Sequence, residues 1–175
     1  MDINKSTTVA FIGYPTSQIT YFKNDPNLLT AISKKVEIII RRLHQYGYTT
    51  FCSGMEEGFD TIASEAVLKI KQELPEVRLI AVIPFMEREP SLNHNPAFYN
   101  GTDKVIYTSD ADHPKELLIR NKYLLANCSQ VVCYYDGQHG DTERVVNDAV
   151  RLKLPIINIY EELSDYFTST SSAIK

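Results

Sequence analysis

The chain has 175 residues, of which 43% are hydrophobic and 23% charged, a length and composition that predict one globular domain. Its 18 basic and 22 acidic residues give a net charge of −4. That balance counts against non-specific nucleic-acid binding, because such binders use a basic excess to displace counterions.

The order of predicted elements indicates an α/β fold. Short runs rich in β-branched and aromatic residues alternate with longer runs of helical periodicity, which is typical of a mostly parallel sheet covered by helices on both faces. We predict about six strands, at Thr8–Ile12, Tyr48–Cys52, Arg78–Ile83, Lys104–Tyr107, Val131–Tyr135 and Ile156–Ile159. The domain is expected to span residues 1–163, with a flexible tail over 164–175.

Helices are predicted between these strands. Apolar residues at helical spacing indicate helices over Leu29–Leu43, Thr61–Leu74 and Glu143–Leu152. The segment 86–102 interrupts the alternation with two prolines and several polar residues. It follows a strand, so it is either a binding loop or a solvated surface loop.

Two glycine-marked turns each stand between a predicted strand and a predicted helix. The first contains Ser53 and Gly54, and the second contains Gly137 and Gly140. Glycine lets a ligand approach the backbone closely, and a helix N-terminus presents free N–H groups to an anion. The pair therefore predicts a site for a phosphate-bearing ligand at the carboxyl edge of the sheet.

The polar residues of these turns also have structural interpretations. Ser53 and Glu56 have the spacing of a helix capping box. Asp60 is either the N-cap of the following helix or an acceptor for ribose hydroxyls. The glycines of the second turn could serve the turn alone. His139, within that turn, is a candidate ligand contact or proton donor.

A fourth helical pattern carries two further candidates. Leu117, Leu124 and Cys128 form an apolar stripe that includes Asn121. A buried amide needs partners, which a ligand or a neighbouring backbone could supply. Arg120 could hold a phosphate in a fork geometry, or it could form a surface ion pair.

Metal, disulfide and membrane roles are not expected. The three cysteines form no Cys-x-x-Cys pair, and the four histidines lack metal-ligand spacing. There is no signal-like N-terminus and no apolar run long enough to cross a bilayer, so we expect a cytoplasmic protein.

These motifs together resemble the SLOG superfamily, the Rossmann-like group that contains DprA/Smf and LOG proteins, and within it the YpsA-like family. The resemblance extends from about Val9 to Ile159. The residues that carry it are Gly13-Tyr14-Pro15, Ser53-Gly54-Met55-x-x-Gly58-x-Asp60, Ala63, Glu65-Ala66, Ile83-Pro84-Phe85, Arg120-Asn121, Tyr135-Asp136-Gly137 and Gly140-x-Thr142.

The resemblance implies a Rossmann-like fold that binds a nucleotide or nucleotide-derived ligand, such as an ADP-ribose-, NAD- or NMP-like molecule. It implies ligand-binding roles for the motif residues Gly13, Met55, Gly58 and Asn121. It places Ser53, Gly54, Gly140 and Thr142 near phosphates, with Arg120 and Asp60 near the same pocket.

Three positions depart from the family pattern. Asp141 replaces the second glycine of the usual Gly-Gly-Thr turn and adds a negative charge beside the expected phosphate. No arginine follows Gly13-Tyr14-Pro15, and Gln130 stands where an aspartate is common.

We interpret the chain as a nucleotide-binding sensor or regulatory module, with no cofactor beyond that ligand and with a homo-oligomer left open. One rival is an N-glycosidic nucleotide hydrolase like the LOG proteins, whose Gly-Thr-x-x-Glu motif has a glutamate where this chain has Val145. The other rival is a DprA-like binder of single-stranded DNA, which the acidic charge balance disfavours.

Overall fold

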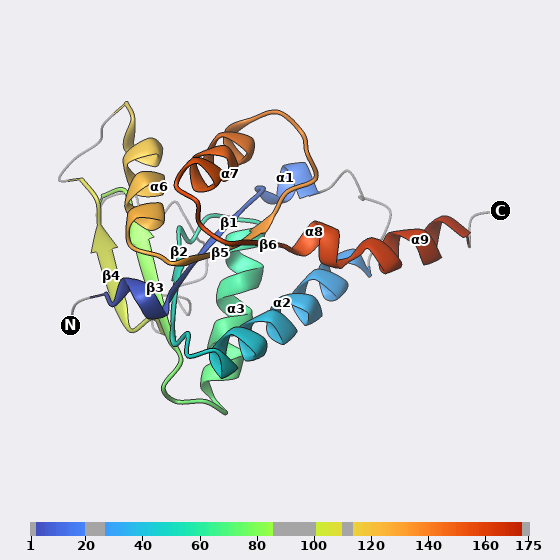
Figure 1. Cartoon of the computed structure of the whole chain (residues 1–175), viewed down its shortest axis with the longest axis horizontal. Helices are drawn as coiled ribbons and strands as arrows, with labels where there is room; N and C mark the ends of the chain where they lie inside the picture. Colours follow the sequence, from blue (N-terminus) through green and yellow to red (C-terminus); the bar gives the residue numbers. More distant parts are fainter. Residues whose placement is uncertain (1–2, 20–26, 86–100, 110–113, 173–175) are drawn as a thin grey trace.

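The computed structural model describes residues 3–19, 27–85, 101–109 and 114–172 (Figure 1). Six parallel strands form one sheet in the order β4-β3-β2-β1-β5-β6. The strands are β1 (Thr8–Gly13), β2 (Thr50–Ser53), β3 (Arg78–Ile83), β4 (Lys104–Tyr107), β5 (Gln130–Tyr134) and β6 (Ile156–Asn158).

Helices cover the sheet on both faces, which makes the three-layer Rossmann-like architecture that the sequence predicts. The helices are η1 (Lys5–Thr7), α1 (Thr16–Ile19), α2 (Leu28–Gln45), α3 (Phe59–Lys71), α6 (Glu116–Ala126), α7 (Asp141–Arg151), α8 (Ile159–Glu162) and α9 (Ser164–Ser172). Helices α2, α3 and α8 lie on one face, and α6 and α7 lie on the other (Figure 1).

Alternate residues of the central strand build the two cores. Val9 and Phe11 of β1 pack into the cluster under α2 and α3, whereas Ala10 and Ile12 pack into the cluster under α6 and α7. Successive side chains of a strand point to opposite faces, so a strand buried on both faces reads as a continuous apolar run.

All six predicted strands are present, and β3 and β4 have the predicted bounds. Strand β2 begins two residues later than predicted, at Thr50. The reason is the end of α2, where Gly47 adopts a φ of +90° and the backbone N–H of Tyr48 donates to the carbonyl of Leu43 at 3.1 Å. Tyr48 therefore completes a helix terminus and does not join the sheet.

The segment expected to be a flexible tail begins in helix α9. Tyr166 and Phe167 of this helix pack against the core under α2 and α8. The flexibility of residues 164–175 stays a prediction. The candidate binding loop, predicted over 86–102, lies outside the described residues except for its last two.

The sheet has one topological switch point, between β1 and β5. From β1 the chain proceeds outward through β2, β3 and β4, and it then returns to add β5 on the other side of β1. Ligands of open α/β sheets bind in the crevice at the carboxyl ends of the strands at such a point. A ligand-binding site is therefore expected around Gly13 and Tyr134, the last residues of β1 and β5.

Candidate ligand-binding site

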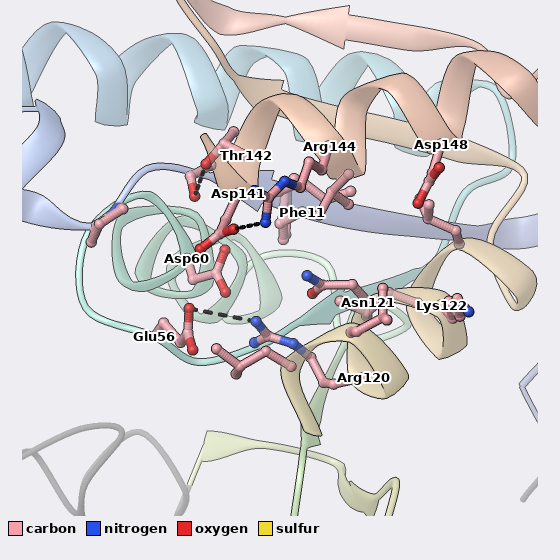
Figure 2. A pocket seen from close by; sticks show the side chains of 18 of the residues that line it. Phe11, Glu56, Asp60, Arg120, Asn121, Lys122, Asp141, Thr142, Arg144 and Asp148 are labelled. Atoms are coloured by element: carbon pink, nitrogen blue, oxygen red, sulfur yellow. Dashed lines mark hydrogen bonds and ion pairs between the residues drawn. The ribbon is translucent and has the colours of Figure 1, made fainter. Parts of the chain in front are cut away.

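A cavity of about 420 Å³ lies at the carboxyl edge of the sheet beside this switch point. Its walls come from the end of β1 and the loop that follows it, from the turn after β2, and from helices α6 and α7. Figure 2 shows Glu56, Asp60 and Arg120 on one side of it and Asp141, Thr142 and Arg144 on the side of α7. The volume is in the range of small-molecule sites.

Five of the predicted ligand-binding residues line this cavity: Gly13, Asp60, Arg120, Asn121 and Thr142. The other predicted ligand-binding residues are not among the lining residues: Ser53, Gly54, Met55, Gly58, Gly137 and Gly140.

Arg120 is a buried cation in the wall of the cavity. Its exposure is only 5%, so the surface ion pair considered for it is not what forms. Its Nη2 lies 3.4 Å from Oε2 of Glu56, whereas Nε and Nη1 have no hydrogen-bond partner among the described residues. Buried N–H groups normally find acceptors, so this guanidinium has spare hydrogen-bonding capacity for an anion.

Gly54 makes room for Arg120. A Cβ atom at position 54 would overlap Nη1 of Arg120 and would stand 2.8 Å from Oδ2 of Asp60. We expected this glycine to allow a ligand to approach the backbone, but the group that approaches it is the guanidinium. The sequence pattern found a real steric requirement without showing which group imposes it.

Asp60 is a buried carboxylic acid that faces Arg120 across Gly54. Burial raises its pKa from 3.8 to about 7, an effect that Arg120 and the backbone N–H groups of Glu56 and Gly54 partly oppose. Asp60 is not the N-cap of α3, because that helix starts at Phe59 with Gly58 as its cap.

Gly58 is required by packing around the first turn. Its φ is +113°, a conformation that favours glycine, and a Cβ there would collide with the backbone carbonyl of Tyr14. The backbone N–H of Phe59 donates to that same carbonyl at 3.0 Å. Gly58 therefore joins the start of α3 to the loop after β1.

Ser53 and Met55 also act within the turn. The Ser53 hydroxyl accepts from the backbone N–H of Met55 at 3.1 Å and donates to the Asp60 carbonyl at 3.4 Å. It does not form the capping box with Glu56, since α3 begins six residues after it. Met55 adopts a φ of 60° and is buried beside Ala81.

The second turn leads into α7. Thr142 donates its hydroxyl to the carbonyl of Gly13 at 3.2 Å, which fixes the first turn of α7 against the end of β1. Gly140 is the N-cap, with a φ of +154° and open space where a Cβ would stand. Asp141 lines the cavity and pairs with Arg144 at 2.9 Å on an exposed part of its rim.

Gly137 and His139 lie on the outer part of this turn. Gly137 has a φ of +93° and open space around it, so turn geometry alone explains the glycine. His139 has an almost fully exposed side chain, and its Nδ1 pairs with Glu143 at 3.0 Å. Neither residue lines the cavity, so the structure does not bring His139 to the site.

Further charged residues complete the cavity wall. Its lining includes four carboxylates, Glu56, Asp60, Asp141 and Asp148, and three cations, Arg120, Lys122 and Arg144. The sequence pattern indicates only a capping role for Glu56, and it does not predict Arg144 or Asp148 as site residues. Their spacing from Asp141 along α7 places them near one face of that helix, which is the signal that could have found them.

No metal-binding group of three or more histidine, cysteine or acidic side chains occurs within the described residues. All three cysteines are free and buried. In the parts of the chain that the structure describes, no helix is long and apolar enough to span a membrane.

Comparison with known proteins decides the family. The model of the family described as "YspA SLOG family" matches residues 9–156, most of the chain. The chain belongs to the YpsA family of SLOG proteins. A UPF0398 protein of Bacillus thuringiensis (strain Al Hakam) is 22% identical over 164 residues, covering 87% of this chain and 86% of the relative.

One further relative and one solved structure are also similar to this chain. A UPF0398 protein of Halalkalibacterium halodurans is 26% identical over 135 residues, and the match covers 73% of this chain and 71% of the relative. The solved structure is that of DNA processing protein A from Helicobacter pylori, a single-stranded-DNA-binding protein. It has a TM-score of 0.58 to this chain at 17% sequence identity, and the match covers 94% of this chain and 74% of the Helicobacter pylori chain. At that identity the likeness shows the shared Rossmann-like fold of this YpsA-family chain.

Proposed function

We propose that this YpsA-family chain binds a nucleotide or nucleotide-derived ligand in the cavity between β1, α6 and α7, and acts as a sensor or regulatory module. The observation that carries the proposal is Arg120, a buried guanidinium in the cavity wall with two nitrogens that have no partner among the described residues. An oxyanion such as a phosphate is the natural complement of that group.

The N-terminus of α7 supports the same assignment from the opposite wall. Asp141 and Thr142, its first residues, line the cavity, and the partial positive charge of a helix N-terminus favours a bound anion there. Gly140, directly before them, leaves open space at the backbone. A phosphate between Arg120 and this terminus would be held from both sides.

The carboxylates limit how much negative charge the cavity accepts. Glu56 and Asp60 stand beside Arg120, and Asp141 stands at the start of α7. Asp60 contributes less repulsion near neutral pH, because burial raises its pKa to about 7. Asp141 is partly compensated by its pair with Arg144.

The hydrolase alternative lacks a carboxylate at the position on α7 where the LOG proteins have their glutamate, although Asp141 and Asp148 of α7 line the cavity. Val145 stands where the LOG proteins have their glutamate, and it is a buried apolar residue in the cavity wall. The Glu143 carboxylate points to the second glycine turn, where it pairs with His139 and accepts a hydrogen bond from the backbone N–H of Gly140 at 3.4 Å. Binding without turnover is therefore the function we propose.

The test is to examine the purified protein for a retained nucleotide by native mass spectrometry, and then to titrate it with AMP, ADP-ribose and NAD in a calorimeter. The proposal expects saturable binding of at least one of these compounds. A protein that retains no nucleotide and gives no heat of binding with any nucleotide tested would refute it.

A further inference from the structure

A second half of the cavity lies between α6 and α7 and has a different character from the Arg120 end. Apolar side chains line it from α6 and from β1, and α7 contributes one apolar residue, Val145. The apolar residues are Ile12, Leu117, Leu124, Leu125 and Val145, and the charged residues Lys122, Arg144 and Asp148 line the cavity from the same two helices. The apolar residues do not stabilise a phosphate, so they suit a less polar part of the ligand.

The two helices present matching faces to this space. On α6, Leu117, Asn121 and Leu124 follow one another at four and three residues, and on α7 Asp141 and Val145 are four residues apart. Residues at these spacings share one face of a helix. The two helices cover the same face of the sheet but make few direct contacts with each other, and the cavity lies between them.

Asn121 is an uncharged polar group among the apolar residues of α6 that line the cavity. It projects from α6 into the cavity in Figure 2, and it is half-buried. Its amide makes no hydrogen bond within the described residues, unlike Asn127 at the end of the same helix, which donates to the carbonyl of Tyr123 at 2.8 Å. An amide offers one donor next to one acceptor, so its partner in the cavity should carry the complementary pair.

A planar heterocycle with a hydrogen-bond donor beside an acceptor fits both the apolar residues and the amide of Asn121. Its faces would be buried between the apolar side chains of α6 and α7, and its edge would pair with the Asn121 amide. Every nucleobase has such an edge, and asparagine pairs with adenine in this bidentate manner in protein–DNA complexes. Asn121 directly follows Arg120, so a base and a phosphate of one ligand would be held by neighbouring residues of α6.

We propose that the cleft between α6 and α7 receives the base of the ligand and that Asn121 determines which base edge is accepted. This inference rests on the proposed function, because it assigns the second half of the same cavity. It makes Asn121 a specificity-determining residue with a role separate from that of Arg120.

The experiment compares AMP, GMP, CMP and UMP with ribose 5-phosphate, which has the phosphate and sugar but no base. For the wild-type chain we expect at least one nucleotide to bind about ten-fold or more tightly than ribose 5-phosphate. Asn121→Leu, which keeps the size and removes the amide, should abolish most of that advantage, by about 10- to 100-fold for a bidentate pair. Its affinity for ribose 5-phosphate should not change.

Asn121→Asp provides a second variant of the same shape. A carboxylate only accepts, so the variant should favour GMP, whose base has two adjacent donors, over the nucleotide preferred by the wild type. The control is Asn147→Leu, the same substitution at an exposed position of α7 that does not line the cavity.

The outcomes separate this inference from the proposed function. Equal binding of all nucleotides and ribose 5-phosphate would overturn the role of the cleft while leaving the phosphate site intact. A base preference that survives Asn121→Leu would overturn the role of Asn121. Failure of every compound to bind would overturn the proposed function itself, and this inference with it.

Discussion

Arg120 and Gly54 act as one unit. The guanidinium occupies the position where a side chain at residue 54 would begin, so the absence of a Cβ is what allows Arg120 to lie beside Asp60. The glycine therefore serves the binding site indirectly, through the residue that it admits.

This pairing predicts a non-additive mutant cycle. Gly54→Ala should displace Arg120 and weaken nucleotide binding nearly as much as Arg120→Ala, about 10-fold or more, because the charged hydrogen bonds are lost in both variants. In the Arg120→Ala background, Gly54→Ala should then cost little further affinity. Calorimetry of the four proteins measures the coupling, and additive losses would show that Gly54 contacts the ligand independently.

Asp60 should make stability depend on pH. The folded chain keeps this carboxyl protonated up to a pKa of about 7, whereas the unfolded chain releases the proton near the usual value of 3.8. The folded state thus binds an extra proton between these values, and the free energy of unfolding falls as pH rises through that interval and levels off above it.

Asp60→Asn removes this contribution. Relative to wild type, the variant should gain stability from about pH 4 to about pH 7, by an amount on the order of a few kcal/mol, and the difference should stay constant at higher pH. Urea unfolding of both proteins across this range gives the comparison. A difference that does not vary with pH would mean that the carboxyl ionises in the folded chain as it does in water.

We expect no hydrolase activity because of the side chain at position 145. Valine cannot act as an acid, a base or a charge stabiliser, so we expect no release of ribose 5-phosphate from nucleoside monophosphates. Release that scales with protein concentration and disappears in Glu143→Gln would contradict this, and would assign the role to that neighbouring carboxylate.

Helix α7 begins with Asp141, which replaces the second glycine of the family's usual Gly-Gly-Thr turn. Asp141 stabilises the helix N-terminus through the dipole but places a negative charge where we expect the phosphate. The same charge therefore has opposite effects on the helix and on the ligand.

Asp141→Asn should separate the two effects. Nucleotide affinity should rise about two- to five-fold, the size of a single charge at a helix terminus, while the melting temperature falls slightly. Glu65→Gln, which changes the net charge equally at an exposed position of α3, is the control for affinity. Weaker binding by Asp141→Asn would show that the carboxylate contacts the ligand favourably.

Element positions were accessible from the sequence because periodicity reports which face of an element is buried. For β1 the signal is the continuous apolar run of Val9, Ala10, Phe11 and Ile12, which is typical of a strand buried on both faces and predicts β1 almost to the residue. Strand ends were less accessible, since Tyr48 is drawn into the terminus of α2 by a hydrogen bond that no composition signal reveals.

Site residues on one element were easier to predict than those that depend on contacts between elements. Arg120 and Asn121 stand out as polar residues on an apolar helix. Glu56 could not be recognised in the same way, because its partner Arg120 is distant in sequence and meets it only in the fold. The capping role considered for Asp60 was wrong for a similar reason: Gly58 caps α3 by packing against the loop after β1.

For the whole molecule, the net charge sets the expected response to DNA. The Helicobacter pylori structure with this fold is that of a single-stranded-DNA-binding protein. This chain, at −4, has little drive from counterion release. We therefore expect weak DNA binding that is lost at about 150 mM ionic strength. Fluorescence anisotropy with a labelled oligonucleotide tests this, and tight binding that persists at that ionic strength would contradict it.

The part of the chain that matches the family model also forms the cavity. The YpsA family model covers residues 9–156, which include every element that lines the cavity. The switch point between β1 and β5 brings the turn after β2, helix α6 and the start of α7 to one edge of the sheet. The fold thus gathers residues from four separate segments around one buried cation.

The most direct measurement is calorimetric titration of wild type and Arg120→Ala with AMP, ADP-ribose and NAD. The account predicts saturable binding to wild type and a loss of about 10- to 100-fold in Arg120→Ala, with circular dichroism showing that the fold is kept. Arg151→Ala, which removes the same charge from an exposed site on α7 outside the cavity, should bind like wild type. Equal affinities of the wild-type and Arg120→Ala proteins, or no binding by either, would contradict the central claim that Arg120 holds the phosphate of a nucleotide.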